Sequence, residues 1–439
     1  MDLKDLFLTP LYLGIFYAIA YAVRPKFTNV YTKKYFIPAL TVKFIGAIGL
    51  GVIYQFYYKG GDTFNYYNQA KVIYEAFDKS FDIGLKLLMH SSSEAIITYT
   101  NRIYWYNSST EYFVIQLAGF FSLLCFNTYT IIAIFFAALS FTGMWAMYIT
   151  FSSLYPGIYN KFSLPVFFLP SVFFWGSGLM KDSLCIGALG WIFYAINHIF
   201  ILKNKIITSS VFGLIAIYIL TATKVYILLS FIPAALFWVF IENNKRIKSA
   251  TTRNLLKPIF IITGAFAAYL IAINITAGDE RFDVDKIGER TKITKDYLST
   301  YVISGSAYDI GTLDGSLGSI LRVSPQAIFI SLFRPFIFEA KNPVMVLSSL
   351  EAFLFLYLTI ALFYKTGILK GFKLIVSEPV ILFCFLFSII FAIGVGTNSG
   401  NFGTLVRYKI PLMPFYLSAL YIMQYKSVPI SETRKQAQI

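Results

Sequence analysis

The sequence predicts an all-α protein, a polytopic bundle of transmembrane helices. Of its 439 residues, 57% are hydrophobic and 19% aromatic, whereas only 13% are charged. A soluble domain carries roughly 25% charged residues. The apolar residues also gather into runs close to the about 20 residues that a helix needs to cross a bilayer. Short loops rich in Lys and Arg separate many of these runs, as in multi-pass membrane proteins.

The apolar runs predict about 11 spans. We expect them near residues 6–23, 36–57, 111–126, 130–151, 183–202, 206–222, 225–241, 258–277, 344–364, 379–396 and 407–424. Segment 163–176 is apolar but short and contains Pro165 and Pro170, which predicts a broken or re-entrant helix lining a cavity. Segment 326–340 is expected to lie at the membrane surface as an interfacial helix, with Arg334-Pro335 in its middle.

The basic loops predict the orientation, because Lys and Arg favour the cytoplasmic side. They place the C-terminus and loops 24–35, 203–205, 242–257 and 365–378 in the cytoplasm. The periplasmic face then receives loops 58–110, 177–183, 278–343 and 397–407. We therefore expect a single integral membrane domain, residues 1–439. The high content of Ile, Phe, Tyr, Lys and Asn suggests a bacterial source and hence a bacterial inner membrane. The net charge of +15 suits anionic lipid at these loops and does not indicate nucleic acid.

The first periplasmic loop is organised around the sequence YYKGGDTFNYYNQAKVIYEAFD, residues 57–78. Gly60 and Gly61 permit a sharp turn, and Asp62 is a favoured N-cap residue for the helix that follows. Tyr66 and Tyr67 follow Asp62 on that helix. Two interpretations stay open: a capped surface helix, or a catalytic carboxylate at the membrane surface.

The second large periplasmic loop, 278–343, begins as a charged helical stretch. It becomes small, polar and glycine-rich at 305–318, which predicts either a mobile cover over a substrate or a solvated connector.

Two further segments carry cations that are suited to binding an anion. Lys181 and Asp182 stand between two apolar runs. Either they neutralise each other, or Lys181 forms an anion site with the N–H groups of Ser177, Gly178 and the start of the 183–202 helix. Arg407, followed by Lys409, opens the last expected span. It is suited to bidentate phosphate binding, and the alternative is an arginine that snorkels to the headgroups.

Ionisable residues within or beside spans are costly and mark candidate functional positions. Arg334 with Glu339 is one such candidate. Glu351, Lys43 and Lys224 are others. Glu351 could instead form a structural ion pair with Lys43 or Arg334.

Taken together, a carboxylate, several cations and many aromatic residues suit glycosyl transfer from a polyprenyl-phosphate donor. Asp62 would act as general base, and the cations would stabilise the leaving phosphate. The aromatic residues Tyr66, Tyr67, Tyr104, Trp105 and Tyr106 would stack on sugars. We expect no cofactor. Loop 58–110 has no DxD pair, so a divalent metal is not indicated, and no metal ligands are assigned.

Five motifs carry a resemblance to a known group: GGDTFNYY, FWGSGLMKDSL, SAYDIG, LFRPFIFEAKNP and VRYKIPLMPF. They resemble bacterial multispanning envelope proteins related to GT-C glycosyltransferases and to O-antigen or capsular polysaccharide polymerases. The resemblance implies a catalytic role for Asp62 and a donor-phosphate role for Arg407. In GT-C proteins the acidic loop usually follows the first span, whereas here it follows the second expected span, so transferase and polymerase both stay open.

Two other functions fit the same residues. One is a transporter or flippase of lipid-linked glycans, although the single broken segment and the lack of an internal repeat disfavour it. The other is a non-catalytic membrane subunit of an envelope or secretion complex. The expected partners are a lipid-linked sugar donor, a glycan acceptor and membrane lipid.

Overall fold

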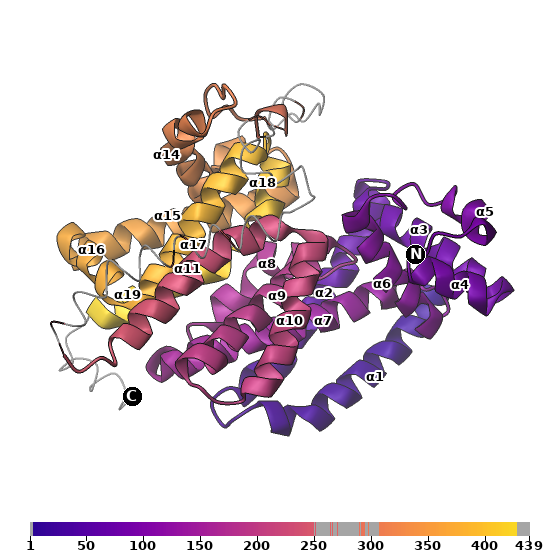
Figure 1. Ribbon diagram of the computed structural model, residues 1–439, viewed down its shortest axis with the longest axis horizontal. Helices are drawn as coiled ribbons and strands as arrows, with labels where there is room; N and C mark the ends of the chain where they lie inside the picture. The colour runs from indigo at the N-terminus through magenta and orange to yellow at the C-terminus, as the bar shows by residue number, and fades with distance from the viewer. Residues whose placement is uncertain are drawn as a thin grey trace. The chain divides into compact units, whose positions relative to one another are not determined.

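The computed structural model describes residues 3–249 and 307–427, with a few isolated positions between 251 and 297. The regular structure of this described part is helical (Figure 1), and only the single bridge between Ala307 and Asn401 is of β type. The predicted all-α fold is therefore confirmed for these residues. Most of the expected 258–277 span and most of residues 278–306 of loop 278–343 lie outside the described residues.

Eight described helices are long and apolar enough to cross a membrane, and each corresponds to an expected span. They support a multi-pass membrane protein. Two of them include a π-helical last turn. The eight are α1 (Leu3–Phe27), α2 with its π turn (Lys33–Tyr57), α7 (Tyr129–Leu154), α9 with its π turn (Lys181–Ile201), α10 (Ile206–Thr223), α11 (Val225–Asn244), α15 (Pro343–Thr366) and α17 (Pro379–Asn398).

Two other expected spans differ in the structure. The 111–126 span is helix α6 (Ser109–Leu124), which is shorter than the eight. The expectation of one helix over 407–424 is wrong, because the chain forms α18 (Phe402–Tyr408) and α19 (Met413–Ser427) with a break between them. Pro411 lies in the break, where its ring and missing N–H oppose a continuous helix.

Prolines also account for the irregular segments. Segment 163–176 contains a π-helical turn (Leu164–Phe168) and then the short helix α8 (Pro170–Trp175), so its helical path is interrupted. The expected single helix over 326–340 is wrong. Helix α14 (Leu317–Phe333) stops before Arg334, because Pro335 disfavours helical geometry at the preceding residue.

The chain forms two compact units, which we describe separately. The first contains residues 1–147, 172–193 and 211–224. In it, α3 (Asp62–Lys79) packs against α4 (Phe81–Leu88) and α6. The helical character expected for loop 58–110 is thus present. Helix α5 (Ile97–Thr100) follows in the same loop. Helix α1 buries few of its residues.

Glycines allow α7 and α9 to pack closely within the first unit. A Cβ added at Gly143 would lie 1.7 Å from the carbonyl oxygen of Gly187. A Cβ at Gly190 would lie 2.0 Å from the carbonyl oxygen of Gly143. Small residues at helix contacts are the usual route to close backbone packing between membrane helices. These three glycines therefore set the separation of the two helices.

The second unit contains residues 148–171, 194–210 and 225–439. Helix α17 lies at its centre and packs against α11, α14, α19 and α16 (Ile368–Ser377), as Figure 1 shows. Its core is aromatic: the Phe231 ring lies 5.3 Å from that of Phe383 and 5.2 Å from that of Phe387, both edge-on. Edge-to-face packing of this kind adds to the stabilisation from burial.

We expect the substitution Gly143→Ala to destabilise the protein by about 1–3 kcal/mol, the usual cost of overpacking. The added methyl group meets backbone atoms of α9 and cannot be accommodated by a side-chain rotation. Thermal unfolding in detergent would measure the effect. Gly14→Ala in α1 is the matched control, because a Cβ there meets nothing within 4 Å. Equal unfolding temperatures for the two variants would contradict the close α7–α9 contact.

Candidate functional site

Asp62 is the first residue of α3 and is half-buried. The expectation that it forms the N-cap is wrong, because Gly61 occupies that position. Gly60 and Gly61 have φ angles of 137° and 121°, which L-residues with side chains rarely adopt. A Cβ at Gly61 would also lie 2.7 Å from the Tyr54 ring. The turn therefore requires glycine and fixes the point at which the Asp62 carboxylate leaves the backbone.

The aromatic residues beside Asp62 are largely part of the packing. Tyr66 is only 3% exposed and its ring lies 5.1 Å from that of Trp105. The Tyr67 hydroxyl donates to the carbonyl of Asn127 over 2.9 Å. Tyr104, in contrast, is 88% exposed. Tyr66 and Tyr67 thus hold α3 in place, and Tyr104 is the aromatic residue of the expected sugar-stacking set with an open face.

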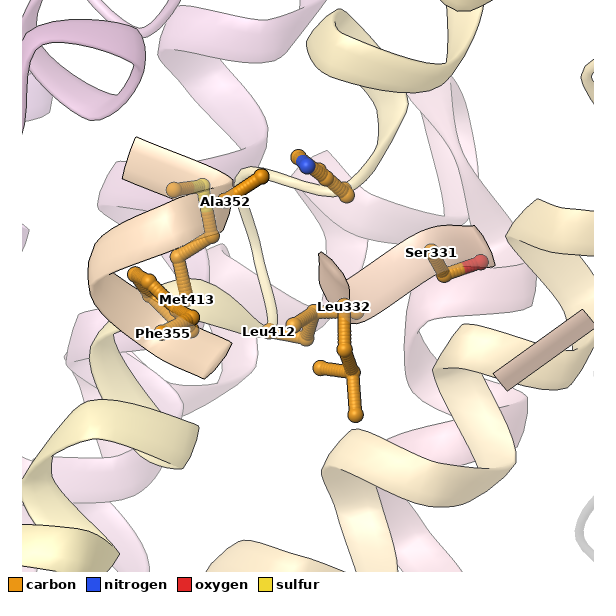
Figure 2. Close-up of a pocket in the computed structure, with 7 residues that line it drawn as sticks. Ser331, Leu332, Ala352, Phe355, Leu412 and Met413 are labelled. Carbon is orange, nitrogen blue, oxygen red and sulfur yellow. The ribbon is translucent and has the colours of Figure 1, made fainter. Parts of the chain in front are cut away.

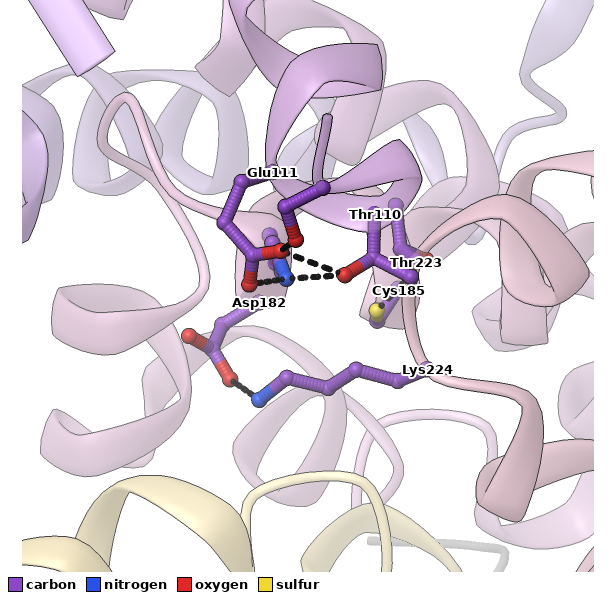
Figure 3. Close-up of polar contacts among 8 residues, drawn as sticks. Thr110, Glu111, Asp182, Cys185, Thr223 and Lys224 are labelled. Carbon is purple, nitrogen blue, oxygen red and sulfur yellow. Dashed lines mark hydrogen bonds and ion pairs between the residues drawn. The ribbon is translucent and has the colours of Figure 1, made fainter. Parts of the chain in front are cut away.

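A buried cluster of two ion pairs joins α6, α9 and the end of α10 (Figure 3). Lys181 at the start of α9 pairs with Glu111 and donates to the Thr110 hydroxyl over 3.0 Å. Asp182 accepts from Lys224 over 2.6 Å, and these two side chains are 3% and 10% exposed. Ser108 and Thr110 also donate to the Glu111 carboxylate. Both carboxylates are therefore matched by lysines.

The possibility that Lys181 and Asp182 neutralise each other is thereby corrected. Consecutive helical residues point in different directions, so neighbours in sequence do not face each other on a helix. Each reaches a different element instead: Lys181 reaches α6, and Asp182 reaches the residue after α10. Glu111 did not emerge from the sequence as a candidate. The available signal was its position as an acidic residue that opens an apolar run.

Lys43 has a backbone partner. It is fully buried in α2 and donates to the carbonyl oxygen of Gly176, which also accepts from the Ser140 hydroxyl over 2.8 Å. The suggested ion pair of Glu351 with Lys43 is not found. Glu351, on α15, accepts hydrogen bonds from the N–H of Ser171, over 2.8 Å, and from its hydroxyl. Ser171 was not identified from the sequence.

The second unit holds Arg334, Lys409 and Arg407. Arg334 pairs with Glu339, as the sequence suggested, so its other suggested pairing with Glu351 is also not found. The Arg334 guanidinium lies 4.9 Å from the centroid of the Phe402 ring. Burial would raise the pKa of Glu339, but hydrogen bonds from Arg334 and from the N–H of Phe336, with the attraction of the Arg334 charge, lower it overall.

Lys409 connects this group to the break before α19. It is 2% exposed, and its ammonium donates to the Arg334 carbonyl oxygen over 2.9 Å. Arg407 is half-buried in the last turn of α18. Helix α18 is capped by Asn401, whose side chain accepts from the Thr404 N–H over 2.9 Å. Loop residues 307–343 and 397–409 thus meet in this unit.

A small pocket lies beside Lys409 (Figure 2). Most of its lining is apolar, with Ser331 and Lys409 as the polar contributors; the other lining residues are Leu332, Ala352, Phe355, Leu412 and Met413. A sugar diphosphate needs several polar partners, so this pocket does not match the expected substrate.

The site predicted from sequence falls into two groups. Asp62, Tyr66, Tyr67, Lys181, Asp182 and Lys224 lie in the first unit, and Arg334, Glu351, Arg407 and Lys409 in the second. Within the described residues, no three His, Cys, Asp or Glu side chains gather as a metal site. No family model, curated protein or solved structure matches this chain.

We expect Lys224→Met to destabilise the protein by about 3–5 kcal/mol, because it leaves the Asp182 carboxylate buried without its ammonium partner. The double variant Lys224→Met/Asp182→Asn removes both charges and should recover much of this loss. Thermal unfolding in detergent would compare the two.

The matched control is Lys86→Met. Lys86 forms an exposed i,i+4 pair with Asp82, and such a pair contributes little. A double variant that is less stable than Lys224→Met would contradict the interpretation of Asp182 and Lys224 as a mutually compensating buried pair.

Proposed function

We propose that the protein is a glycosyltransferase or polysaccharide polymerase of a bacterial inner membrane. It would act on polyprenyl-phosphate-linked sugars at the periplasmic face, with its C-terminus in the cytoplasm. The proposal rests on the apolar helices, on the residues around Asp62 and on the five motifs that resemble GT-C and polymerase proteins. The lipid-linked donor and a glycan acceptor would be its substrates.

The observation that carries the proposal is the restrained backbone at Asp62, the first residue of α3. A general base must be held within hydrogen-bond reach of the proton that it removes. The Gly60-Gly61 turn and the packing of α3 through Thr63, whose hydroxyl lies 2.8 Å from that of Tyr129, restrain the start of this helix. Asp62 would remove the proton from the acceptor hydroxyl, and Tyr104 would offer a face to the sugar.

The phosphate of the donor needs a cation, and Arg407 is the residue that we assign to it. A guanidinium can bind two phosphate oxygens at once. Lys409 would support Arg407 from the same segment. Arg334 and Lys181 form ion pairs with Glu339 and Glu111. To bind the phosphate directly, either cation would have to exchange its carboxylate partner for the phosphate. We therefore give these two a supporting role.

A transporter of lipid-linked glycans is the second candidate, and the buried cluster of Glu111, Lys181, Asp182 and Lys224 favours it. Ionisable groups at membrane helices often mark ion or substrate pathways. A transporter would need this cluster to exchange partners during its cycle, and it would not need a base at Asp62.

The first test is Asp62→Asn, with surface glycan measured in cells and the protein measured in the membrane fraction. Asparagine has the size of aspartate but cannot act as a base. We expect loss of the glycan product, by at least the 100-fold that general-base catalysis typically contributes, at a normal protein level.

Asp82→Asn is the matched control, because Asp82 is an exposed carboxylate in the same loop and should tolerate the change. Normal glycan in the Asp62→Asn cells would sink the proposed chemistry. If Lys224→Met/Asp182→Asn then abolished export of lipid-linked glycan, the transporter would be favoured.

The second test is Arg407→Ala. If the guanidinium stabilises the leaving phosphate, its removal should lower the transfer rate by about 100-fold or more, in line with other groups that stabilise developing charge. The measurement is transfer from a lipid-linked donor by purified protein in vesicles. Arg322→Ala, at an exposed position of α14, is the control. Equal rates for the two variants would exclude the role of Arg407.

A further inference from the structure

Helix α16 (Ile368–Ser377) connects two candidate spans, α15 and α17. It packs against both of them and against α19 in the second unit. Its packed side carries Gly371, where a Cβ would lie 2.8 Å from the Phe363 ring. Because the flanking helices are spans, their α16 ends lie where the hydrocarbon core of a membrane gives way to the headgroups. The position of α16 is therefore that of a membrane interface.

The outer side of α16 is apolar over a wide sector. Ile368, Leu369, Phe372 and Val376 are 65%, 87%, 58% and 70% exposed. Their spacing of three and four residues, with Leu369 beside Ile368, places them on one side of the helix. A cluster of four large exposed apolar side chains on one short helix requires a cover of low polarity.

Besides its packed side and its apolar outer side, the helix has a remaining sector that is polar and basic. Lys370, Lys373 and Ser377 follow one another at spacings of three and four residues. Lys365 lies at the adjoining end of α15. These three lysines are exposed, and none forms an ion pair with a described residue. Positive charge beside an exposed apolar sector is the pattern of helices that lie in the plane of an anionic membrane surface.

We propose that α16 is an in-plane anchor that binds the anionic leaflet of the membrane. Leu369, Val376 and their neighbours enter the boundary between headgroups and acyl chains, and Lys365, Lys370 and Lys373 contact lipid phosphates. Because the apolar and basic sectors are adjacent, the helix can bury its apolar side chains and bring its lysines to the lipid phosphates at the same depth in the membrane. Each lysine near an anionic surface attracts lipid, and the lysines therefore select anionic lipid over neutral lipid. This role is independent of the proposed transferase chemistry.

The test uses the full chain reconstituted in vesicles of phosphatidylcholine with or without phosphatidylglycerol. Leu369→Cys and Ser377→Cys variants are labelled with an environment-sensitive fluorophore, and the wild-type chain measures background labelling of its three buried thiols. We expect the label at position 369 to emit at shorter wavelength and to be quenched by nitroxide on lipid acyl chains. The label at 377 should be quenched by iodide in solution instead.

Two outcomes would overturn the proposal. Iodide quenching of the 369 label would show that this side faces water. Protection from both quenchers would show that a protein surface covers it.

The role of charge is tested with Lys370→Gln/Lys373→Gln, with Lys71→Gln/Lys79→Gln as the control at exposed lysines of α3. Phosphatidylglycerol should increase the quenching of the 369 label by acyl-chain nitroxide in the control but not in the α16 variant. The same response in both would exclude selection of anionic lipid by these lysines.

Discussion

The carbonyl oxygen of Gly176 accepts hydrogen bonds from two side chains, Lys43 of α2 and Ser140 of α7, and so links the end of α8 to both helices of the first unit. Helix α8 ends at Trp175, so this carbonyl lies where an intrahelical donor is lost. A backbone carbonyl without a partner costs several kcal/mol in an apolar environment. Helix α2 also approaches closely, because a Cβ at Gly46 would lie 2.3 Å from the carbonyl oxygen of Phe173. The interruption is thus built into the packing of α2 and α7.

The break between α8 and α9 determines which partners Lys181 and Asp182 meet. Because the chain turns at 176–180, a new helix begins at Lys181, and its first two residues diverge toward different elements. Lys181 meets Glu111 at the start of α6, and Asp182 meets Lys224 at the end of α10. A charge pair adjacent in sequence thereby ties three helices together. Lys181, which suggested an anion site in the sequence, is therefore already paired with Glu111 in this cluster.

The sequence predicted the long helices well, because each requires only a local run of apolar residues. It predicted less well where local preference and packing compete. Pro411 and Pro335 marked the true breaks, yet the apolar run around Pro411 suggested a continuous span. Partners were the least predictable feature. That Glu351 contacts Ser171, 180 positions away in sequence, follows only from how α8 and α15 pack. A helix does begin at Asp62, but its N-cap is Gly61, which has a φ angle of 121° that side-chain-bearing residues rarely adopt.

The charge cluster bears on the choice between the two candidate functions. Moving Lys224 away leaves the buried Asp182 carboxylate uncompensated, which costs about 3–5 kcal/mol. A transporter would have to offset this cost in each cycle with a proton or with its substrate. A transferase would keep the cluster closed and use it to hold α6, against which α3 packs. The Gly60-Gly61 turn restrains Asp62 on the same helix, so the arrangement as a whole fits a static support. A static cluster is what the proposed transferase needs, because its base would be Asp62 and not a buried lysine.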